Sequence, residues 1–234
     1  MLIGLGRRST RIRTGTPIRS RLFKQSAFDP TSACNNKASF GPLTDYINYG
    51  YVPSPEHSST TLEAITDDRS AAALLQALPA PTLQAAGVTQ DDISKLFTRA
   101  GNWQNIFDNS LKTRRARTAG TPEGKGGYTM GALIDGSFHE STETNYFWSF
   151  AQDWTALVNK LGPDRAAAKT AAMERLNKLF DLNADLTNSE PDSKALNHGE
   201  RYDTYYMGNE MNFSSPWAYN WIGRRSTRST SSRR

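Results

Sequence analysis

The sequence predicts an all-α fold, and three observations support this prediction. Apolar residues recur at helical spacing in several stretches of the chain. Two of these stretches begin on a threonine that is followed three residues later by an acid, which is typical of a helix start. No stretch shows the apolar–polar alternation that a half-buried strand requires. We therefore expect helices that are separated by long polar loops.

Two helices are expected in the first half of the chain. The first begins at Thr60, takes Glu63 as its capping partner, and ends before Pro79. The second begins at Thr89 and carries its apolar stripe as far as Phe107. On the first helix, the charged cluster at residues 67–69 is expected to be a solvated or salt-bridged face.

The second half is expected to contain three more helices after a long loop. Residues 109–136 are rich in Thr, Arg and Gly and form the loop. A third helix is predicted over residues 147–161 and is closed by Gly162. A fourth spans residues 163–180, with its proline in the first turn, and a short last helix begins near Pro216.

The formal net charge of +5 is unevenly distributed along the 234 residues. The first 28 residues hold seven of the 28 Lys and Arg, and residues 224–234 hold five, without any acid in either tail. The remaining 16 face 23 Asp and Glu, so residues 29–223 carry a net charge of −7. We expect three parts: a basic, largely disordered segment (1–39), a helical domain (40–223) and a disordered Arg/Ser-rich tail (224–234). Because the body is acidic, no nucleic-acid partner is expected.

Several classes of protein are excluded by motifs and composition. A single cysteine, Cys34, cannot form an internal disulfide framework. No apolar run approaches the ~20 residues of a membrane-spanning helix, and no secretory signal is visible. Three histidines without an HExxH pattern argue against zinc, and the nucleophile-elbow, Walker and dinucleotide motifs are missing from the sequence.

Residues 138–154, FHESTETNYFWSFAQDW, contain the highest density of side chains that bind ligands or transfer protons. Glu140, Glu143 and Asn145 lie beside large aromatic residues, including Trp148. Rings that stack on sugars and carboxylates that bind hydroxyls or move protons are typical of carbohydrate sites. The alternative is that the acids favour a helix start and the rings fill a core.

A second stretch, residues 205–210, presents an amide and a carboxylate at a glycine-containing turn. Asn209 and Glu210 supply hard oxygen ligands that suit a calcium ion or vicinal sugar hydroxyls. The alternative is that both side chains only make hydrogen bonds within the turn.

The order of these motifs resembles glycoside hydrolase family 92. The segments are NYGYVP, TTLE, RAGNWQNIFD, DGSFHESTETNYFWSFAQDW and YMGNEMNFSSPWAYNWIG, and together they extend over about residues 40–223. The resemblance implies an (α/α)6 barrel, of which this chain holds an incomplete part. It also implies a calcium-dependent, inverting α-mannosidase that trims mannose-containing N-glycans and is secreted or extracellular.

The resemblance also implies roles for particular residues. The family's T-E-G-N segment matches residues 142–145, so Glu143 is the expected general acid. Glu140, Asn145, Trp148, Trp103 and Glu210 are expected to bind the sugar, and Asn209 and Glu210 to bind calcium.

Three departures from the family pattern are visible. Thr144 replaces a glycine and Met211 replaces a proline beside these residues. The later D-D-x-G-x-M-S-A-W segment, which carries the family's general base, does not occur in this sequence. The resemblance therefore predicts a truncated enzyme, and the alternative is a non-catalytic, vestigial glycan-binding protein.

Overall fold

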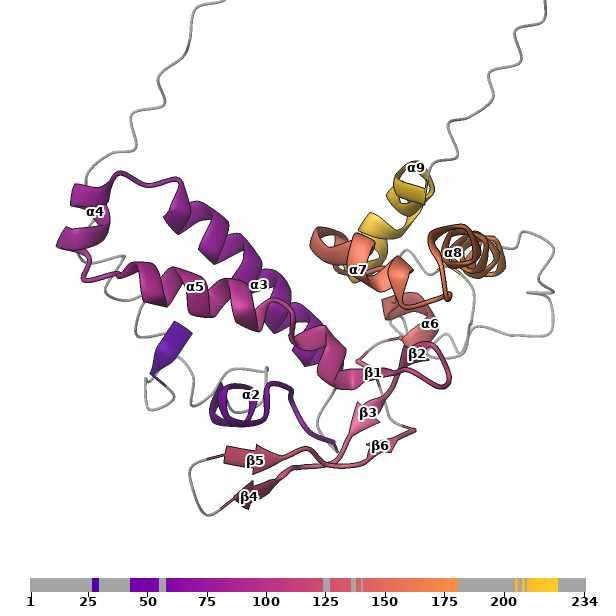
Figure 1. The fold of residues 1–234 in the computed structure, drawn as a ribbon, viewed down its shortest axis with the longest axis horizontal. Coiled ribbons are helices and arrows are strands. Elements are labelled where there is room, and N and C mark those ends of the chain that lie inside the picture. The colour runs from indigo at the N-terminus through magenta and orange to yellow at the C-terminus, as the bar shows by residue number, and fades with distance from the viewer. Residues whose placement is uncertain are drawn as a thin grey trace, which may run out of the picture.

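The computed structural model describes residues 27–29, 43–54, 58–123, 127–135, 138–139, 141–180, 205, 208 and 210–222. Within these residues the chain is rich in helix, as the sequence predicts. Figure 1 shows two groups of helices with short strands and α2 (Leu43–Tyr49) below them. Glu140, Asn209 and most of both tails lie outside the described residues.

The first group is a pair of long helices with a short helix at its outer end. These are α3 (Ser59–Gln76), α4 (Ala80–Ala85) and α5 (Gln90–Arg99), and α3 packs along α5 (Figure 1). Their shared core is aliphatic and consists of Ala72, Leu75, Leu83, Ala86, Val88, Ile93 and Leu96.

The predicted start of α5 is confirmed, whereas the predicted start of α3 is wrong. Thr89 Oγ1 accepts a hydrogen bond from the Asp92 amide (3.1 Å), and Asp92 Oδ2 accepts one from the Thr89 amide (2.9 Å). At α3 the N-cap is Ser58, which makes no side-chain capping hydrogen bond, and Thr60 lies inside the helix. The neighbouring Thr61 hydroxyl instead accepts a hydrogen bond from the Val52 amide (2.9 Å) and thus holds the preceding loop.

The elements that directly follow α5 are shorter than the preceding helices. The apolar stripe that was expected to stay helical to Phe107 leaves the α-helix at Arg99 and continues as the 3-10 helix η1 (Asn102–Ile106). Trp103 and Ile106 are nevertheless buried, so the stripe predicted burial correctly and the helix length incorrectly.

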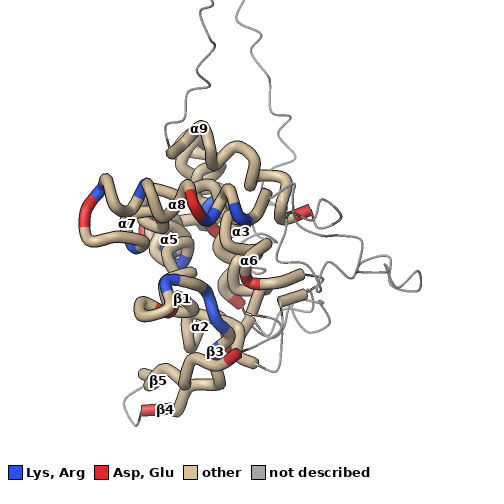
Figure 2. The backbone as a smooth tube through the Cα atoms, turned by 90° about the vertical axis from the view of Figure 1, so that its right-hand side faces the viewer, with Lys and Arg blue, Asp and Glu red and all other residues tan. Residues whose placement is uncertain are grey.

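The expectation of a fold without strands is wrong for the region after η1. Six strands of two or three residues form three antiparallel pairs, β1 with β2, β3 with β6, and β4 with β5. Their bounds are Phe107–Asp108, Thr113–Arg114, Ala116–Arg117, Thr121–Glu123, Gly127–Thr129 and Leu133–Ile134, in the order β1 to β6. Strands this short contain too few residues for an alternating pattern to be visible. Arg114, Arg115 and Arg117 form a basic run along β2 and β3 (Figure 2).

The second group of helices follows the strands. It contains α6 (Glu143–Tyr146), η2 (Ala151–Asp153), α7 (Trp154–Asn159), α8 (Arg165–Leu179), η4 (Glu210–Trp217) and α9 (Ala218–Ile222). The helix predicted over residues 147–161 is therefore broken, because α6 ends before it and the backbone of Phe150 is not helical (φ −119°, ψ 85°). The large apolar residues of this stretch all lie in the core, which is rich in aromatic rings.

The fourth predicted helix exists, but its start is two residues later than expected. Asp164 is the N-cap, and its Oδ1 accepts hydrogen bonds from the amides of Ala166 and Ala167, both at 2.9 Å. Gly162 lies so close to this turn that a Cβ atom would come within 2.4 Å of the Ala168 nitrogen. The glycine therefore permits the close approach of α7 and α8. The short last helix is confirmed as α9.

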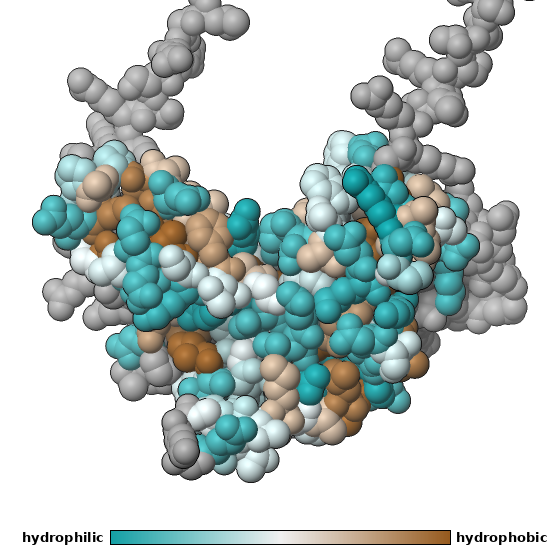
Figure 3. All heavy atoms as spheres, in the orientation of Figure 1, coloured by the Kyte–Doolittle hydropathy of each residue, from teal (hydrophilic) through white to brown (hydrophobic). Residues whose placement is uncertain are grey.

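In the face drawn in Figure 3, apolar patches lie at the outer end of the helix pair and along the lower edge, while the middle of the molecule is mainly polar. Among the described residues, no helix is long and apolar enough to cross a membrane.

Candidate active site

The candidate acid, Glu143, is the first residue of the one-turn helix α6. Thr142 caps this helix, and its hydroxyl accepts a hydrogen bond from the Asn145 amide (3.3 Å). A carboxylate in the first turn of a helix is stabilised by the backbone dipole. Glu143 is half-buried, so its side chain is held by the fold while it remains accessible.

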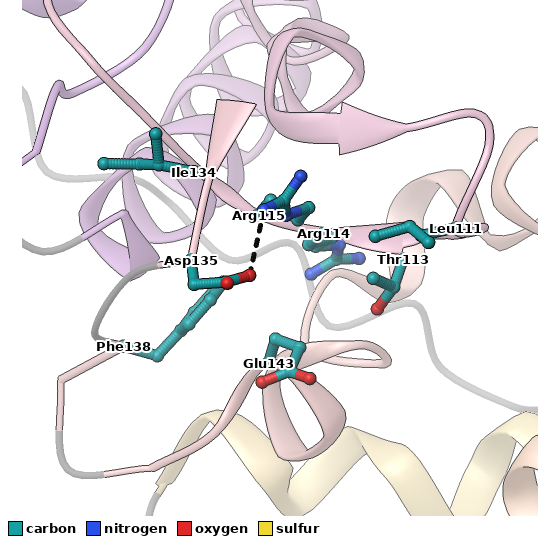
Figure 4. A pocket seen from close by; sticks show the side chains of 8 residues that line it. All are labelled: Leu111, Thr113, Arg114, Arg115, Ile134, Asp135, Phe138 and Glu143. Atoms are coloured by element: carbon teal, nitrogen blue, oxygen red, sulfur yellow. Dashed lines mark hydrogen bonds and ion pairs between the residues drawn. The ribbon is translucent and has the colours of Figure 1, made fainter. Parts of the chain in front are cut away.

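Glu143 lines a pocket that opens beside β2 and β6 (Figure 4). The pocket has a volume of about 330 Å³, within the range of small-molecule sites. Apolar and polar side chains contribute together, which suits a ligand with an apolar face and many hydroxyls. The lining residues are Leu111, Thr113, Arg114, Arg115, Ile134, Asp135, Phe138 and Glu143.

Arg114 joins the pocket to α6. Its side chain is fully buried, and its two terminal nitrogens donate to the carbonyl oxygens of Tyr146 (2.5 Å) and Phe147 (2.7 Å). The guanidinium lies 3.9 Å from the centre of the Phe150 ring. Burial, together with the charge of Arg175, lowers the pKa of Arg114 well below its usual range. The arginine thus fixes the end of the helix that begins with Glu143.

Arg175, from α8, is the second cation near the candidate acid. Its guanidinium lies 4.2 Å from the centre of the Phe147 ring and donates to the Lys112 carbonyl oxygen (3.0 Å). Burial lowers the pKa of Arg175, and the nearby charge of Glu143 acts in the opposite direction. Two arginines, Arg114 and Arg175, therefore lie near the Glu143 carboxylate.

The structure brings the stretch that contains Glu143 against η4, the helix that begins at Glu210. Asn212 in η4 donates a hydrogen bond to Asn145 Oδ1 in α6 (3.0 Å), and both side chains are buried. The Ser214 hydroxyl of η4 donates to the Trp148 carbonyl oxygen (3.0 Å). Glu210, at the start of η4, is exposed to solvent. The α6 and η4 segments are therefore adjacent, although they are far apart in the sequence.

The two tryptophans expected in the sugar site lie inside the core. Trp148 is fully buried and packs against Phe147 and Trp154. Trp103 is also fully buried, and its Nε1 donates to Asp153 Oδ2 (2.6 Å). Neither ring lines the pocket that holds Glu143.

The described residues do not by themselves fit a calcium ion. No group of three or more His, Cys, Asp or Glu side chains comes together in the part of the chain that the structure describes. Calcium takes six to eight oxygen ligands, and of the two expected ligands only Glu210 is described. Asn209 lies outside the described residues, so the expected metal site stays a prediction.

Three charged pocket residues were missed by sequence reasoning: Arg114, Arg115 and Asp135. They come from the segment that was interpreted as a structureless loop, and no motif marks them. The β3–β6 pairing, in which Ala116 faces Ile134, brings Arg115 and Asp135 together. A hairpin prediction for this segment would have been needed to find them.

Comparisons with known proteins identify the family of the chain. The sequence matches the model of the glycosyl hydrolase family 92 catalytic domain over residues 20–234. No sequence among the curated proteins matches the chain.

Two solved structures of a family 92 α-mannosidase from Bacteroides thetaiotaomicron resemble the fold. One has a TM-score of 0.52 at 23% identity, and the other, in complex with mannoimidazole, has a TM-score of 0.51 at 24% identity. Each likeness covers 80% of this chain, but the chain spans only 22% and 23% of those proteins. The family match over most of the chain shows that this protein belongs to glycosyl hydrolase family 92 and carries sequence of its catalytic domain.

Proposed function

We propose that this chain is the acid-bearing part of a glycoside hydrolase that cleaves α-linked mannose, with Glu143 as the general acid. The observation that carries the proposal is the position of Glu143. It begins a capped helix and lines a pocket of mixed polar and apolar character in a member of this family. The mannosidase neighbours, one in complex with mannoimidazole, support a mannose-containing glycan as the substrate.

In the proposed reaction Glu143 donates its proton to the glycosidic oxygen as the bond between that oxygen and the anomeric carbon breaks. Inversion requires a second carboxylate that takes a proton from the attacking water on the opposite face of the sugar. We propose that this base belongs to a segment outside the present sequence. The natural reaction is then the trimming of N-glycans outside the cell by the whole domain.

Several further assignments belong to the same proposal. Glu140 and Glu210 contact the sugar, whereas the buried Asn145, Trp148 and Trp103 support the wall of its site from the core. Asn209 and Glu210 hold calcium, and no step of the reaction above depends on that ion. Residues 40–223 form the catalytic part between the basic tails (1–39 and 224–234).

The experiment is the hydrolysis of an aryl α-mannoside by the purified chain, with calcium and then with a chelator. We expect Glu143→Gln to lower any turnover by about 10²- to 10⁴-fold, because the amide cannot donate a proton as a carboxylic acid does. Binding of the mannoside should be retained. Glu174→Gln, at an exposed acid on α8, is the matched control. Unchanged turnover in Glu143→Gln excludes this residue as the acid, and chelator-resistant turnover excludes the calcium requirement.

The second candidate function is binding of mannose-containing glycans without hydrolysis. The observation that favours it is the state of the other carboxylate in the pocket. Asp135 Oδ1 accepts a hydrogen bond from Arg115 Nη2 at 2.9 Å, so this oxygen is already engaged in an ion pair. Mannoside binding without turnover, in the presence of calcium, identifies this function. Any turnover that the chelator abolishes excludes it.

A further inference from the structure

We infer that Arg115 and Asp135 form a binding subsite for the hydroxyl groups of the leaving-group sugar. This inference rests on the proposed function, because it assigns a part of the substrate to the pocket that Glu143 lines. Figure 4 shows Glu143 on one side of the pocket and the Arg115–Asp135 pair across from it.

The pair is held in place by strand pairing. Ala116 and Ile134 are partners in the β3–β6 ladder, so the next residues outward, Arg115 and Asp135, face each other. Arg115 Nη2 donates to Asp135 Oδ1 at 2.9 Å. The Arg115 side chain is mostly buried (22% exposed), whereas the Asp135 side chain is fully exposed. The buried arginine therefore presents an accessible carboxylate at the pocket.

A second carboxylate, that of Asp108, also binds the Arg115 guanidinium. Asp108 Oδ1 accepts hydrogen bonds from the Ser110 hydroxyl (2.6 Å), the Ser110 amide (2.8 Å) and the Leu111 amide (3.1 Å). These bonds, mainly that from the Ser110 hydroxyl, lower the pKa of Asp108, so it stays ionised. Its other oxygen accepts from Arg115 Nη1 at 3.3 Å. The turn, Asp108, Arg115 and Asp135 thus form one preorganised chain of contacts.

The chemistry of the pair suits sugar hydroxyls. A carboxylate accepts hydrogen bonds from hydroxyl groups, and a guanidinium donates to hydroxyl oxygens, so the pair offers both functions side by side. Ile134 and Phe138 add apolar surface to the same pocket, as an amphipathic sugar ring requires. The pocket is small, which favours one sugar unit over an extended glycan.

The position of α6 indicates which sugar unit enters this pocket. The helix contacts both β2 and η4, and Asn212 in η4 donates to Asn145 in α6. The proposed calcium ligand Glu210 is the first residue of η4. The general acid must reach the oxygen that joins the cleaved mannose to the leaving group. With mannose at η4, the pocket at β2 and β6 receives the leaving group.

The test compares two ligands and two variants by isothermal titration calorimetry on the full chain. Methyl α-mannoside probes the mannose site alone, and thio-linked α-mannobiose, which resists hydrolysis, adds a second sugar. We expect wild-type chain to bind the disaccharide more tightly than the monosaccharide. Asp135→Asn should weaken disaccharide binding by about tenfold and leave methyl α-mannoside binding unchanged. Because the Asp135 side chain is fully exposed, the variant should fold normally, as checked by circular dichroism.

Asp91→Asn is the control, since Asp91 is also exposed and also bonded to a cation, Lys95 (2.7 Å), but lies on α5. It should change neither affinity. Equal weakening for both ligands in Asp135→Asn, or no weakening, overturns the leaving-group subsite while the proposed function stands. Failure of the wild-type chain to bind either ligand overturns the proposed function and the subsite together.

Discussion

The helix pair (α3 to α5) and the site region (β2 together with α6 to α9) are held together by different kinds of residue. The buried side chains in the core of the helix pair are all aliphatic. Its two main helices, α3 and α5, have 18 and 10 residues. The site region buries aromatic rings together with polar groups such as Arg114, Asn145 and Asn212, and α6 has four residues. In the site region, buried polar groups therefore lie beside the short helix α6.

The physical reason is the supply of hydrogen-bond acceptors. A buried donor needs a partner, and in a continuous helix the carbonyl groups are already engaged. Where the chain breaks after α6, the Phe147 carbonyl oxygen accepts from Arg114, and the Trp148 carbonyl oxygen accepts from Trp154 Nε1 (3.1 Å) and from the Ser214 hydroxyl. The broken helix therefore satisfies side chains that a continuous one would leave without partners.

The largest expected effect on stability comes from removing the buried arginine. Arg114→Ala deletes two hydrogen bonds to carbonyl groups and leaves a cavity beside Phe150, so we expect a loss of about 3 kcal/mol in the free energy of unfolding. Urea denaturation followed by circular dichroism measures it. Arg69→Ala is the control, because Arg69 is an exposed arginine on α3 that lies over the Phe97 ring, and its loss should cost less than about 1 kcal/mol. Equal costs for the two variants would contradict the difference between the regions.

The same difference explains which parts of the fold the sequence predicted. α5 was predicted with its capping residues because Thr89 and Asp92 act within one turn and depend on nothing else. The stripe over residues 147–161 predicted which residues are buried, but not the break at Phe150. Two carbonyl oxygens just before that break accept hydrogen bonds from Arg114, which lies more than 30 residues away in the sequence. Periodicity contains no information on such a distant partner.

For the candidate site, too, the sequence predicted the local motif and missed the contacts between distant segments. Glu143 and its cap Thr142 belong to one local motif, and the structure has them at the start of a helix beside a pocket. Arg115 and Asp135 contact each other through a two-residue strand pair, which is too short to be recognised in the sequence. The contact between Asn145 and Asn212 also joins distant segments. A local motif therefore marked the candidate acid, and only the tertiary structure identifies its surroundings.

An intermediate effect on stability is expected from a change of pH, because a polar cluster joins α2 to the helix pair. The Tyr46 hydroxyl donates to Asp68 Oδ2 (2.8 Å), and Arg99 Nε donates to the same oxygen (2.8 Å). Burial, and then the charge of Asp68, raise the pKa of Tyr46 above its ordinary value of 10.0. The folded chain thus holds this proton more tightly than the unfolded chain does.

The sign of the pH dependence follows from that difference. The stabilisation is complete below pH 10 and is lost as the pH rises above it, by up to about 1.4 kcal/mol per pH unit while only the unfolded state has released the proton. Urea denaturation between pH 9 and pH 11 measures this slope. Tyr46→Phe should have a shallower slope than wild type, at a lower stability near neutral pH. Parallel slopes for the two proteins would show that Tyr46 does not carry the effect.

The smallest expected effect on stability is the difference between removing the N-cap hydroxyl of α5 and removing that of α3. Thr89→Ala removes the hydroxyl that accepts from the Asp92 amide, so it should cost about 1 kcal/mol. Ser58→Ala, at the N-cap of α3, should change stability by less than about 0.5 kcal/mol. The Ser58 hydroxyl is buried, and among the described residues it has no hydrogen-bond partner, so its loss removes no capping bond. Both variants are compared by thermal unfolding at neutral pH. A larger cost for Ser58→Ala than for Thr89→Ala would mean that α3 starts with a side-chain cap after all, and that its start resembles that of α5.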